Sequence, residues 1–119
     1  MPNKILICDD EEGIRESLKL ILSDNYDLIL TEDGAQCIDC VERSNDIDLV
    51  LMDIKMPKMD GLDVLKRIKE KRPELKVIVI TGYKCVETAT EAVRLGASGY
   101  IVKPFKSDEI LATVKNALN

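Results

Sequence analysis

The sequence contains no histidine, and this absence excludes several kinds of chemistry. Without an imidazole, the chain has no serine–histidine or cysteine–histidine catalysis, no histidine metal ligand and no phosphohistidine. Any reaction must therefore depend on carboxylates, lysine and hydroxyl groups. Tryptophan is also absent, and one Phe and three Tyr leave few side chains on which nucleic-acid bases would stack. The net charge of −5 further argues against nucleic acid and anionic membranes as partners.

Long apolar runs are missing as well. The apolar runs are only a few residues long, whereas a membrane-spanning helix needs about 20 residues. No signal peptide is visible, since Lys4 leads directly into a strand-like run. The four cysteines include a CxxC at Cys37 and Cys40, but neither a second such pair nor a histidine lies at metal-ligand spacing. We therefore expect a cytoplasmic protein whose cysteines are reduced and serve in packing.

The 119 residues suggest one domain, 1–119, in which strands alternate with helices. The five expected strands are Ile5–Cys8, Leu28–Thr31, Leu49–Met52, Val77–Thr81 and Gly99–Val102. Between them, apolar residues recur at helical spacing, as they do at Ile14, Leu18, Ile21 and Leu22. Glycine and proline separate these segments, and neither a linker nor a repeat is evident. The pattern predicts an α/β fold, a doubly wound, flavodoxin-like (βα)5 unit with five parallel strands in the order 2-1-3-4-5.

Four acidic residues follow the first expected strand without a break. In an open parallel sheet the carboxyl ends of the strands share one edge, and sites form there. Asp9 and Asp10 end the first strand and Asp53 ends the third, so three carboxylates should converge. Such a cluster is costly without a cation, and its oxygen ligands suit Mg²⁺. Glu11 and Glu12 are expected instead to face solvent at the start of the first helix, where the helix dipole favours negative charge.

Two further polar residues end strands at the same edge of the expected sheet. Thr81 ends the fourth strand, and Lys103 ends the fifth. The Lys103 ammonium is expected to pair with Asp53 at rest or with an incoming phosphoryl group, and the Thr81 hydroxyl to bond a phosphoryl oxygen. A metal site, a carboxylate nucleophile and two groups that balance developing charge together indicate phosphoryl transfer to an aspartate.

Several separated segments carry a resemblance to a known family. They are Asp9-Asp10, LVLMDIKMPKMDG at residues 49–61, Thr81-Gly82 and Lys103-Pro104-Phe105. With these motifs the chain resembles, over essentially its full length, the receiver domain of two-component response regulators. The resemblance implies that Asp53 accepts a phosphoryl group from a histidine kinase or a phosphotransfer protein. It also implies a signalling phosphoacceptor rather than an enzyme, one that catalyses only its own phosphorylation and dephosphorylation.

The resemblance also assigns the metal ligands. Mg²⁺ would be bound directly by Asp10, by Asp53 and by the backbone carbonyl of Lys55. Asp9 would act on the ion through water. No direct binding to nucleic acid or to a membrane is expected of this domain.

A switch is the next implication of the resemblance. Tyr100 matches the family's switch aromatic, three residues before Lys103, and the Lys103–Pro104 peptide bond is expected to be cis. Phosphorylation should draw Thr81 toward the phosphoryl group and rotate Tyr100 inward. The surface formed by the fourth helix, the fifth strand and the fifth helix would then change.

Lys55 and Tyr83 occupy two positions at which this family varies. They lie two residues after Asp53 and two residues after Thr81. Both are expected to overhang the path by which a hydrolytic water approaches. The hypothesis is that they slow dephosphorylation, and the alternative is that both side chains point to solvent.

The sequence also suggests where partners could bind. A candidate docking face for a partner helix bundle consists of Ile14, Glu16 and Ser17. Phosphorylation-dependent homodimerisation through the fourth helix, fifth strand and fifth helix also stays open. The charges available for it are Lys84, Arg94, Asp108 and Glu109.

Three other functions fit the sequence less well than a receiver domain does. A flavin-binding module shares the strand order but needs a hydroxyl- and glycine-rich phosphate loop and aromatic side chains, whereas this loop is acidic and aromatics make up 3%. A metal-dependent phosphohydrolase typically carries Asp-x-Asp, but Ile54 and Lys55 follow Asp53. A pseudo-receiver that only docks partners would not need the complete acidic set.

Overall fold

The computed structural model describes residues 2–56, 58–82 and 86–119, and strands alternate with helices along this part of the chain. The strands are β1 (Lys4–Cys8), β2 (Asp27–Thr31), β3 (Leu49–Met52), β4 (Lys76–Thr81) and β5 (Gly99–Val102). The helices are α1 (Glu12–Leu22), α2 (Gly34–Arg43), α3 (Gly61–Lys71), α4 (Val86–Arg94) and α5 (Ser107–Leu118). Within the described residues, no helix is both long enough and apolar enough to cross a membrane.

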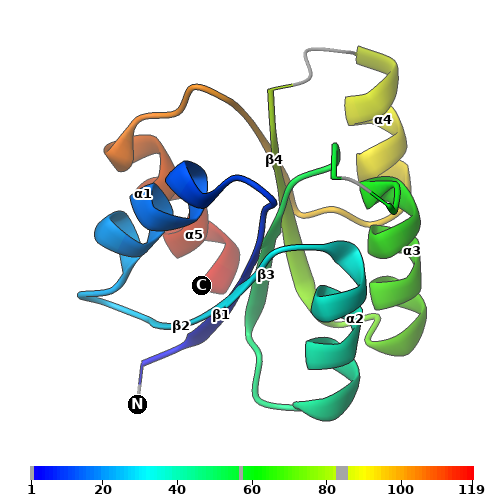
Figure 1. Ribbon diagram of the computed structural model, residues 1–119, viewed down its shortest axis with the longest axis horizontal. Helices are drawn as coiled ribbons and strands as arrows, with labels where there is room; N and C mark the ends of the chain where they lie inside the picture. The colour runs from blue at the N-terminus through cyan, green and yellow to red at the C-terminus, as the bar shows by residue number, and fades with distance from the viewer. Residues whose placement is uncertain (1, 57, 83–85) are drawn as a thin grey trace.

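The five strands form one parallel sheet in the order β2-β1-β3-β4-β5, as predicted (Figure 1). β1 lies inside the sheet, where Ile5 pairs with Leu28 of β2 and with Leu49 of β3. At the other end of β1, Cys8 pairs with Met52 of β3. The residues that follow β1 and β3 are therefore neighbours at the carboxyl edge of the sheet.

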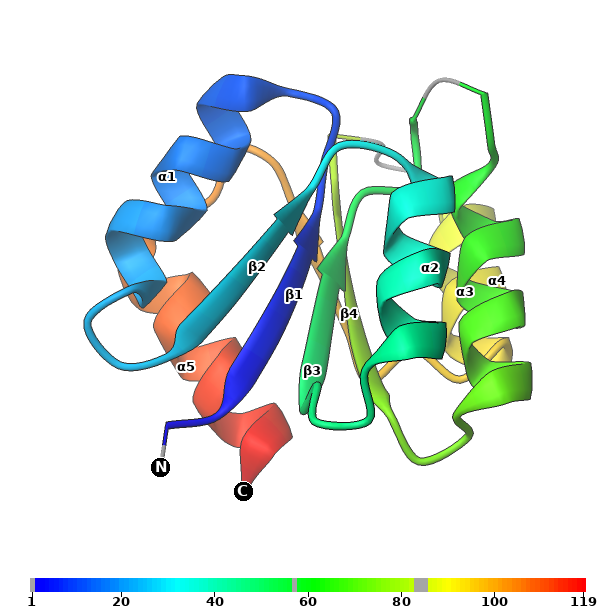
Figure 2. The same ribbon diagram turned by 60° about the horizontal axis from the view of Figure 1, so that its bottom comes forward.

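Helices cover both faces of the sheet, as right-handed crossovers require. α1 and α5 lie on one face, and α2, α3 and α4 lie on the other (Figures 1 and 2). Successive residues of a strand point to opposite faces, so each strand contributes to two hydrophobic clusters. Ile5 and Ile7 of β1 pack toward α1 and α5, whereas Leu6 and Cys8 pack toward α2 and α3. Helices pack over both clusters. This packing holds in place the strand ends that carry the polar residues.

Helices α2 and α3 each begin at a side-chain cap. Asp33 accepts a hydrogen bond from the backbone N–H of Gln36 at 2.9 Å and so caps α2. Asp60 accepts one from the N–H of Leu62 at 2.9 Å and caps α3. A cap of this kind satisfies an N–H group that the helix itself leaves unpaired. The caps fix where the two helices begin, next to the acidic edge of the sheet.

Candidate functional site

Asp9 and Asp53 lie side by side because β1 and β3 are neighbouring strands. The backbone N–H of Asp53 donates to the carbonyl of Cys8 at 3.0 Å, continuing the ladder past the end of β3. Only 2% of Asp9 and 3% of Asp53 is exposed, whereas Asp10 is exposed. The edge therefore presents two buried carboxylates beside one that faces solvent.

Lys103 bridges these two buried carboxylates from β5. Its Nζ lies 2.9 Å from Oδ2 of Asp9 and 3.2 Å from Oδ2 of Asp53. Its backbone N–H donates to the carbonyl of Thr81 at 2.8 Å, which fixes the start of the side chain. The Lys103–Pro104 peptide bond is cis. The expected contact with Asp53 is present, and the contact with Asp9 is shorter.

Burial and ion pairing shift the pKa values of Asp9 and Lys103 in opposite directions. Burial raises the pKa of Asp9, while the N–H of Glu11 and the Lys103 ammonium act in the other direction without cancelling it. Burial would also lower the pKa of Lys103, but the hydrogen bonds and charges of Asp9 and Asp53 outweigh it, and the pKa is raised. The lysine therefore stays charged, and it offsets part of the repulsion between the acids.

Glu11 faces solvent at the start of α1, as predicted, and it also takes part in the site, which was not predicted. Its side chain is 61% exposed, yet Oε1 lies 3.5 Å from Nζ of Lys103. The cause is a turn in which the N–H of Glu11 donates to Oδ1 of Asp9 at 2.9 Å. This turn holds Glu11 over the carboxyl edge as the residue that precedes α1. Its position directly after the aspartate pair was the only sequence signal, because a local turn of this kind leaves no periodic pattern.

Arg15 does not neutralise the acidic edge. Its Nη1 donates to the backbone carbonyl of Asp9 at 2.8 Å, and its Nη2 lies 3.3 Å from Oε1 of Glu32. The guanidinium thus braces the turn after β1 and pairs with a residue beyond β2. In the described part of the chain, the Lys103 ammonium contacts the carboxylates of Asp9, Glu11 and Asp53.

The acidic side chains fit a hard divalent cation. Carboxylate oxygens from Asp9, Asp10, Glu11 and Asp53 all lie within 4.8 Å of one another. Mg²⁺ is bound by oxygen ligands and by one or two carboxylates in most protein sites. The donor set and its spacing therefore suit such an ion.

The connection after β3 is folded back on itself. The N–H of Lys55 donates to Oδ1 of Asp53 at 3.1 Å, and Lys55 forms an antiparallel bridge with Asp60. The N–H of Gly61 donates to the carbonyl of Ile54 at 2.8 Å. A Cβ on Gly61 would lie 2.4 Å from Cα of Ile54, so only glycine permits this approach. The fold-back holds the backbone of Lys55 against the Asp53 carboxylate.

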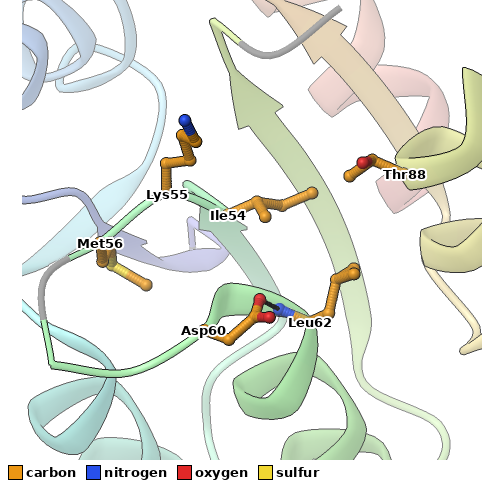
Figure 3. Close-up of a pocket in the computed structure, with 6 residues that line it drawn as sticks. All are labelled: Ile54, Lys55, Met56, Asp60, Leu62 and Thr88. Atoms are coloured by element: carbon orange, nitrogen blue, oxygen red, sulfur yellow. Dashed lines mark hydrogen bonds between the residues drawn. The ribbon is translucent and has the colours of Figure 1, made fainter. Parts of the chain in front are cut away.

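Two cavities adjoin Lys55, and they differ in chemistry. One of about 300 Å³ is lined by Glu11, Asp53, Lys55, Thr81, Gly82 and Lys103. The other, of about 320 Å³, is lined by Ile54, Lys55, Met56, Asp60, Leu62 and Thr88 (Figure 3). In Figure 3 the Asp60 carboxylate turns to the Leu62 amide, and the Lys55 side chain extends away from both. The charged groups converge on the first cavity, so the chemistry belongs there although the second is slightly larger.

The two predicted switch residues, Thr81 and Tyr100, lie on the neighbouring strands β4 and β5. Thr81 is buried at the end of β4 and lines the charged cavity. Tyr100 lies on β5, half-buried, and packs against the cluster on the α2–α3–α4 face. Tyr83 and Lys84 lie outside the described residues.

Comparison with known proteins identifies the family to which the chain belongs. A family model described as the response regulator receiver domain matches residues 5–115. The chain belongs to this family. Receiver domains are the phosphoacceptor units of two-component signalling, and this role applies here. The flavin-binding and phosphohydrolase alternatives receive no support.

Individual relatives agree with the assignment. The chain is 40% identical over 119 residues to sporulation initiation phosphotransferase F of Bacillus subtilis, covering 99% of this chain and 95% of that protein. It is 35% identical to response regulator MprA of Mycobacterium sp. (strain KMS), covering 99% of this chain but 51% of that protein, so it spans about half the length of this relative. The crystal structure of a CheY-like receiver domain protein from Methanospirillum hungatei JF-1 is 32% identical, with a TM-score of 0.94 over 99% of this chain and 94% of that one.

Proposed function

We propose that residues 1–119 act as one receiver unit in which Asp53 accepts a phosphoryl group from a phosphohistidine. The donor is a histidine kinase or a phosphotransfer protein. The observation that carries the proposal is the convergence of Asp53, Lys103 and Thr81 on one cavity beside the acidic group. The unit would catalyse its own phosphorylation and dephosphorylation and no other reaction.

The surroundings of Asp53 support an in-line transfer. One carboxylate oxygen of Asp53 attacks the phosphorus, the P–N bond of the donor breaks, and an acyl phosphate forms as the imidazole leaves. The N–H of Lys55 holds Oδ1, and the Lys103 ammonium lies 3.2 Å from Oδ2. As charge moves onto the phosphoryl oxygens, Lys103 and the Thr81 hydroxyl are placed to bind them. When bound, Mg²⁺ would neutralise further charge on these oxygens.

The exposure of Asp10 supports its role as a direct metal ligand. Asp10 is the exposed aspartate of the acidic group, whereas Asp9 and Asp53 are buried and each has both carboxylate oxygens engaged. Asp10, Asp53 and the carbonyl of Lys55 are proposed to bind the ion directly, and Asp9 is proposed to act through water.

A partner is proposed to dock on α1 beside the site. Glu16 and Ser17 are exposed on α1, and Ile14 is half-buried. Next to them lies a groove of about 260 Å³ lined by Ser17, Leu20, Ile21, Phe105 and Ser107. Leu20 is 81% exposed, which is unusual for a leucine and gives this groove an apolar rim. The groove opens beside the turn after β5 that carries Lys103, so a phosphohistidine on the partner would be within reach.

The output side of the domain is proposed to be the surface formed by α4, β5 and α5. Phosphorylation would draw Thr81 toward the phosphoryl group and turn Tyr100 inward, changing the α4–β5–α5 surface. Homodimerisation through that surface stays a prediction. Arg94 pairs with Glu91 within α4 at 2.7 Å, and Asp108 and Glu109 lie in the first turn of α5, where the helix dipole favours them. The cytoplasmic location also stays a prediction.

Phosphorylation of Asp53→Asn tests the acceptor assignment. Native chain and variants are incubated with Mg²⁺ and acetyl phosphate, and then with a phosphorylated kinase, and the mass of the chain is measured. We expect the native chain to gain one phosphoryl group and Asp53→Asn to gain none. Asp60→Asn is the matched control, because it changes an acid of the same connection and keeps the α3 cap. Full labelling of Asp53→Asn would refute the assignment.

A further inference from the structure

The ammonium of Lys103 has all of its hydrogen-bond donors engaged. Its Nζ donates to Oδ2 of Asp9 at 2.9 Å, to Oδ2 of Asp53 at 3.2 Å and to Oε1 of Glu11 at 3.5 Å. A lysine ammonium carries three N–H donors, so these three bonds use them all. Lys103 can therefore bind a phosphoryl oxygen only when one of the three acids releases it.

The three acids differ in how easily they can leave the ammonium. The side chains of Asp9 and Asp53 are only 3% and 4% exposed, whereas that of Glu11 is 61% exposed. A buried carboxylate that loses its cation becomes an uncompensated charge, which is strongly destabilising. An exposed carboxylate that leaves its cation is hydrated by water, and exposed ion pairs contribute little. Glu11, which also makes the longest of the three contacts, is the acid that should yield.

We propose that Glu11 is a positioning residue that holds, in the resting site, the place on Lys103 that a phosphoryl oxygen takes. An incoming donor must displace the Glu11 carboxylate and is repelled by its charge. The consequence is slower phosphorylation of Asp53 by free anionic donors such as acyl phosphates, so the site discriminates between small donors by their charge. The inference rests on the acceptor role proposed for Asp53.

The backbone of Glu11 is fixed while its side chain has no structural duty in the helix. The N–H of Glu11 donates to Oδ1 of Asp9 at 2.9 Å, and its carbonyl accepts the N–H of Arg15 at 3.1 Å. Glu11 is the N-cap residue of α1, yet its side chain makes no capping hydrogen bond. Short polar side chains such as Ser or Asp are preferred for that task. The carboxylate can therefore swing between Lys103 and water without moving the turn or the helix.

The Glu11 carboxylate also lies where a donor must enter. Glu11 lines the charged cavity of about 300 Å³ together with Asp53 and Lys103. A phosphoryl group that approaches Asp53 through this cavity comes close to the Glu11 carboxylate, and the repulsion grows with the charge of the donor. Glu12, the next residue, is also exposed but belongs neither to this cavity lining nor to the acidic group.

Two small donors of different charge test the proposal. At pH 7 acetyl phosphate is mostly a dianion, whereas phosphoramidate is mostly a monoanion because its nitrogen is protonated. With either donor an oxygen of Asp53 attacks the phosphorus. The P–O bond to acetate then breaks and acetate leaves, or the P–N bond breaks and ammonia leaves with the proton that the nitrogen already carries.

Glu11→Gln keeps the size of the side chain and removes its charge. Its second-order rate constant with acetyl phosphate and Mg²⁺ should rise about threefold or more over that of the native chain, and with phosphoramidate less than about twofold. The gain should shrink at high salt, because salt screens the repulsion at an exposed carboxylate. A purely structural effect of the substitution would depend neither on the charge of the donor nor on salt.

Glu12→Gln is the matched control and should phosphorylate at the native rates. The Mg²⁺ concentration that half-saturates the rate should be the same in Glu11→Gln as in the native chain. Equal rates in Glu11→Gln and Glu12→Gln would overturn the inference, as would an equal gain with both donors. A slower Glu11→Gln that needs more Mg²⁺ would overturn it too, because Glu11 would then be a metal ligand. In each of these cases Asp53 is still labelled and its acceptor role stands, whereas a native chain that neither donor labels would overturn both.

Discussion

The ammonium of Lys103 lies 2.9 Å from Oδ2 of Asp9, although two strands, β3 and β4, separate β5 from β1. The lysine side chain therefore crosses the carboxyl edge and passes over the end of β3, where it also meets Asp53. The Lys103 ammonium is thus held between two buried acids, Asp53 and Asp9. Replacing Asp9 or Asp53 should therefore change the ion pairing of the other acid with Lys103.

The first prediction concerns the pH dependence of stability. Because burial raises the pKa of Asp9 above its ordinary value of 3.8, the folded chain binds this proton more tightly than the unfolded chain. Asp9 thus contributes stability at low pH that is lost as the pH rises from 3.8 through its raised pKa. Asp9→Asn, which does not titrate, should be more stable than the native chain at pH 7 by on the order of 1 kcal/mol.

Urea unfolding between pH 3 and pH 7 measures this difference. The advantage of Asp9→Asn should grow as the pH rises and then level off. Asp24→Asn, which removes an exposed acid in the α1–β2 turn, controls for the loss of one carboxylate. A difference between Asp9→Asn and the native chain that does not vary with pH would contradict the prediction.

The second prediction concerns the metal. Asp10→Ala should abolish Mg²⁺-dependent phosphorylation, or raise the Mg²⁺ concentration it requires at least about tenfold, since a direct ligand is lost. Because Asp10 is exposed, the unfolding midpoint should hardly change. Phosphorylation by acetyl phosphate is measured against Mg²⁺ concentration, with excess chelator as the zero point. Glu12→Ala, an acid just outside the metal-binding group, should leave the titration unchanged.

The third prediction concerns the lifetime of the acyl phosphate. Lys55 is exposed and lines the charged cavity, as the hypothesis of a slowed hydrolysis requires. Combining Lys55→Asn with Tyr83→Ala should shorten the half-life several-fold, because water then approaches the phosphorus more freely. Decay of phosphorylated chain after removal of the donor provides the measurement. An unchanged half-life would mean that both side chains point to solvent.

The fourth prediction compares two glycines. Gly61→Ala should destabilise the chain by about 1–3 kcal/mol, because its Cβ would meet backbone atoms of Ile54 and Asp53 at 2.4 to 2.7 Å. A Cβ on Gly13 meets nothing within 4 Å, and Gly13 lies within α1. Gly13→Ala should therefore stabilise by about 0.5–1 kcal/mol. Urea denaturation of both variants decides, and equal effects would refute the contrast.

The fifth prediction tests the docking groove. Leu20→Arg should slow phosphoryl transfer from a phosphotransfer protein at least about tenfold, because a charged guanidinium replaces the exposed apolar side chain on which the partner is proposed to pack. Transfer from acetyl phosphate should be unchanged, because that donor does not use α1. Val93→Arg is the matched control, since Val93 is also an exposed apolar residue but lies on α4, on the other face of the sheet. An equal loss in both variants would argue against the groove.

The sequence predicts those parts of the site that depend on the sheet alone. Asp9, Asp53, Thr81 and Lys103 each end a strand, and a parallel sheet brings all such ends to one edge. The strand starts are less certain, since β1, β2 and β4 each begin one residue early, at Lys4, Asp27 and Lys76. A charged residue at the first position of a strand does not interrupt the apolar pattern.

Features that depend on local turns or on side-chain reach were not predictable. The contact of Glu11 with Lys103 arises from a turn closed by the Asp9 carboxylate. Lys103 lies closer to Asp9 than to Asp53. This difference depends on the conformation of a long side chain that crosses the ends of several strands. The contact of Cys8 with Met56 joins residues 48 positions apart through the path of a connection. Neither hydrophobic periodicity nor motif spacing carries this information.

The two faces of the sheet also differ in their resistance to oxidation. Buried Cys8, Cys37, Met52 and Met56 all pack on the α2–α3–α4 face, with Cys40 and Met59 at its margin. Among the described residues, the cluster beneath α1 and α5 contains no sulfur. Conversion of a buried thioether to a sulfoxide places a polar group in a core. Peroxide damage should therefore loosen the face that carries α4, while the face with the proposed docking groove keeps its packing.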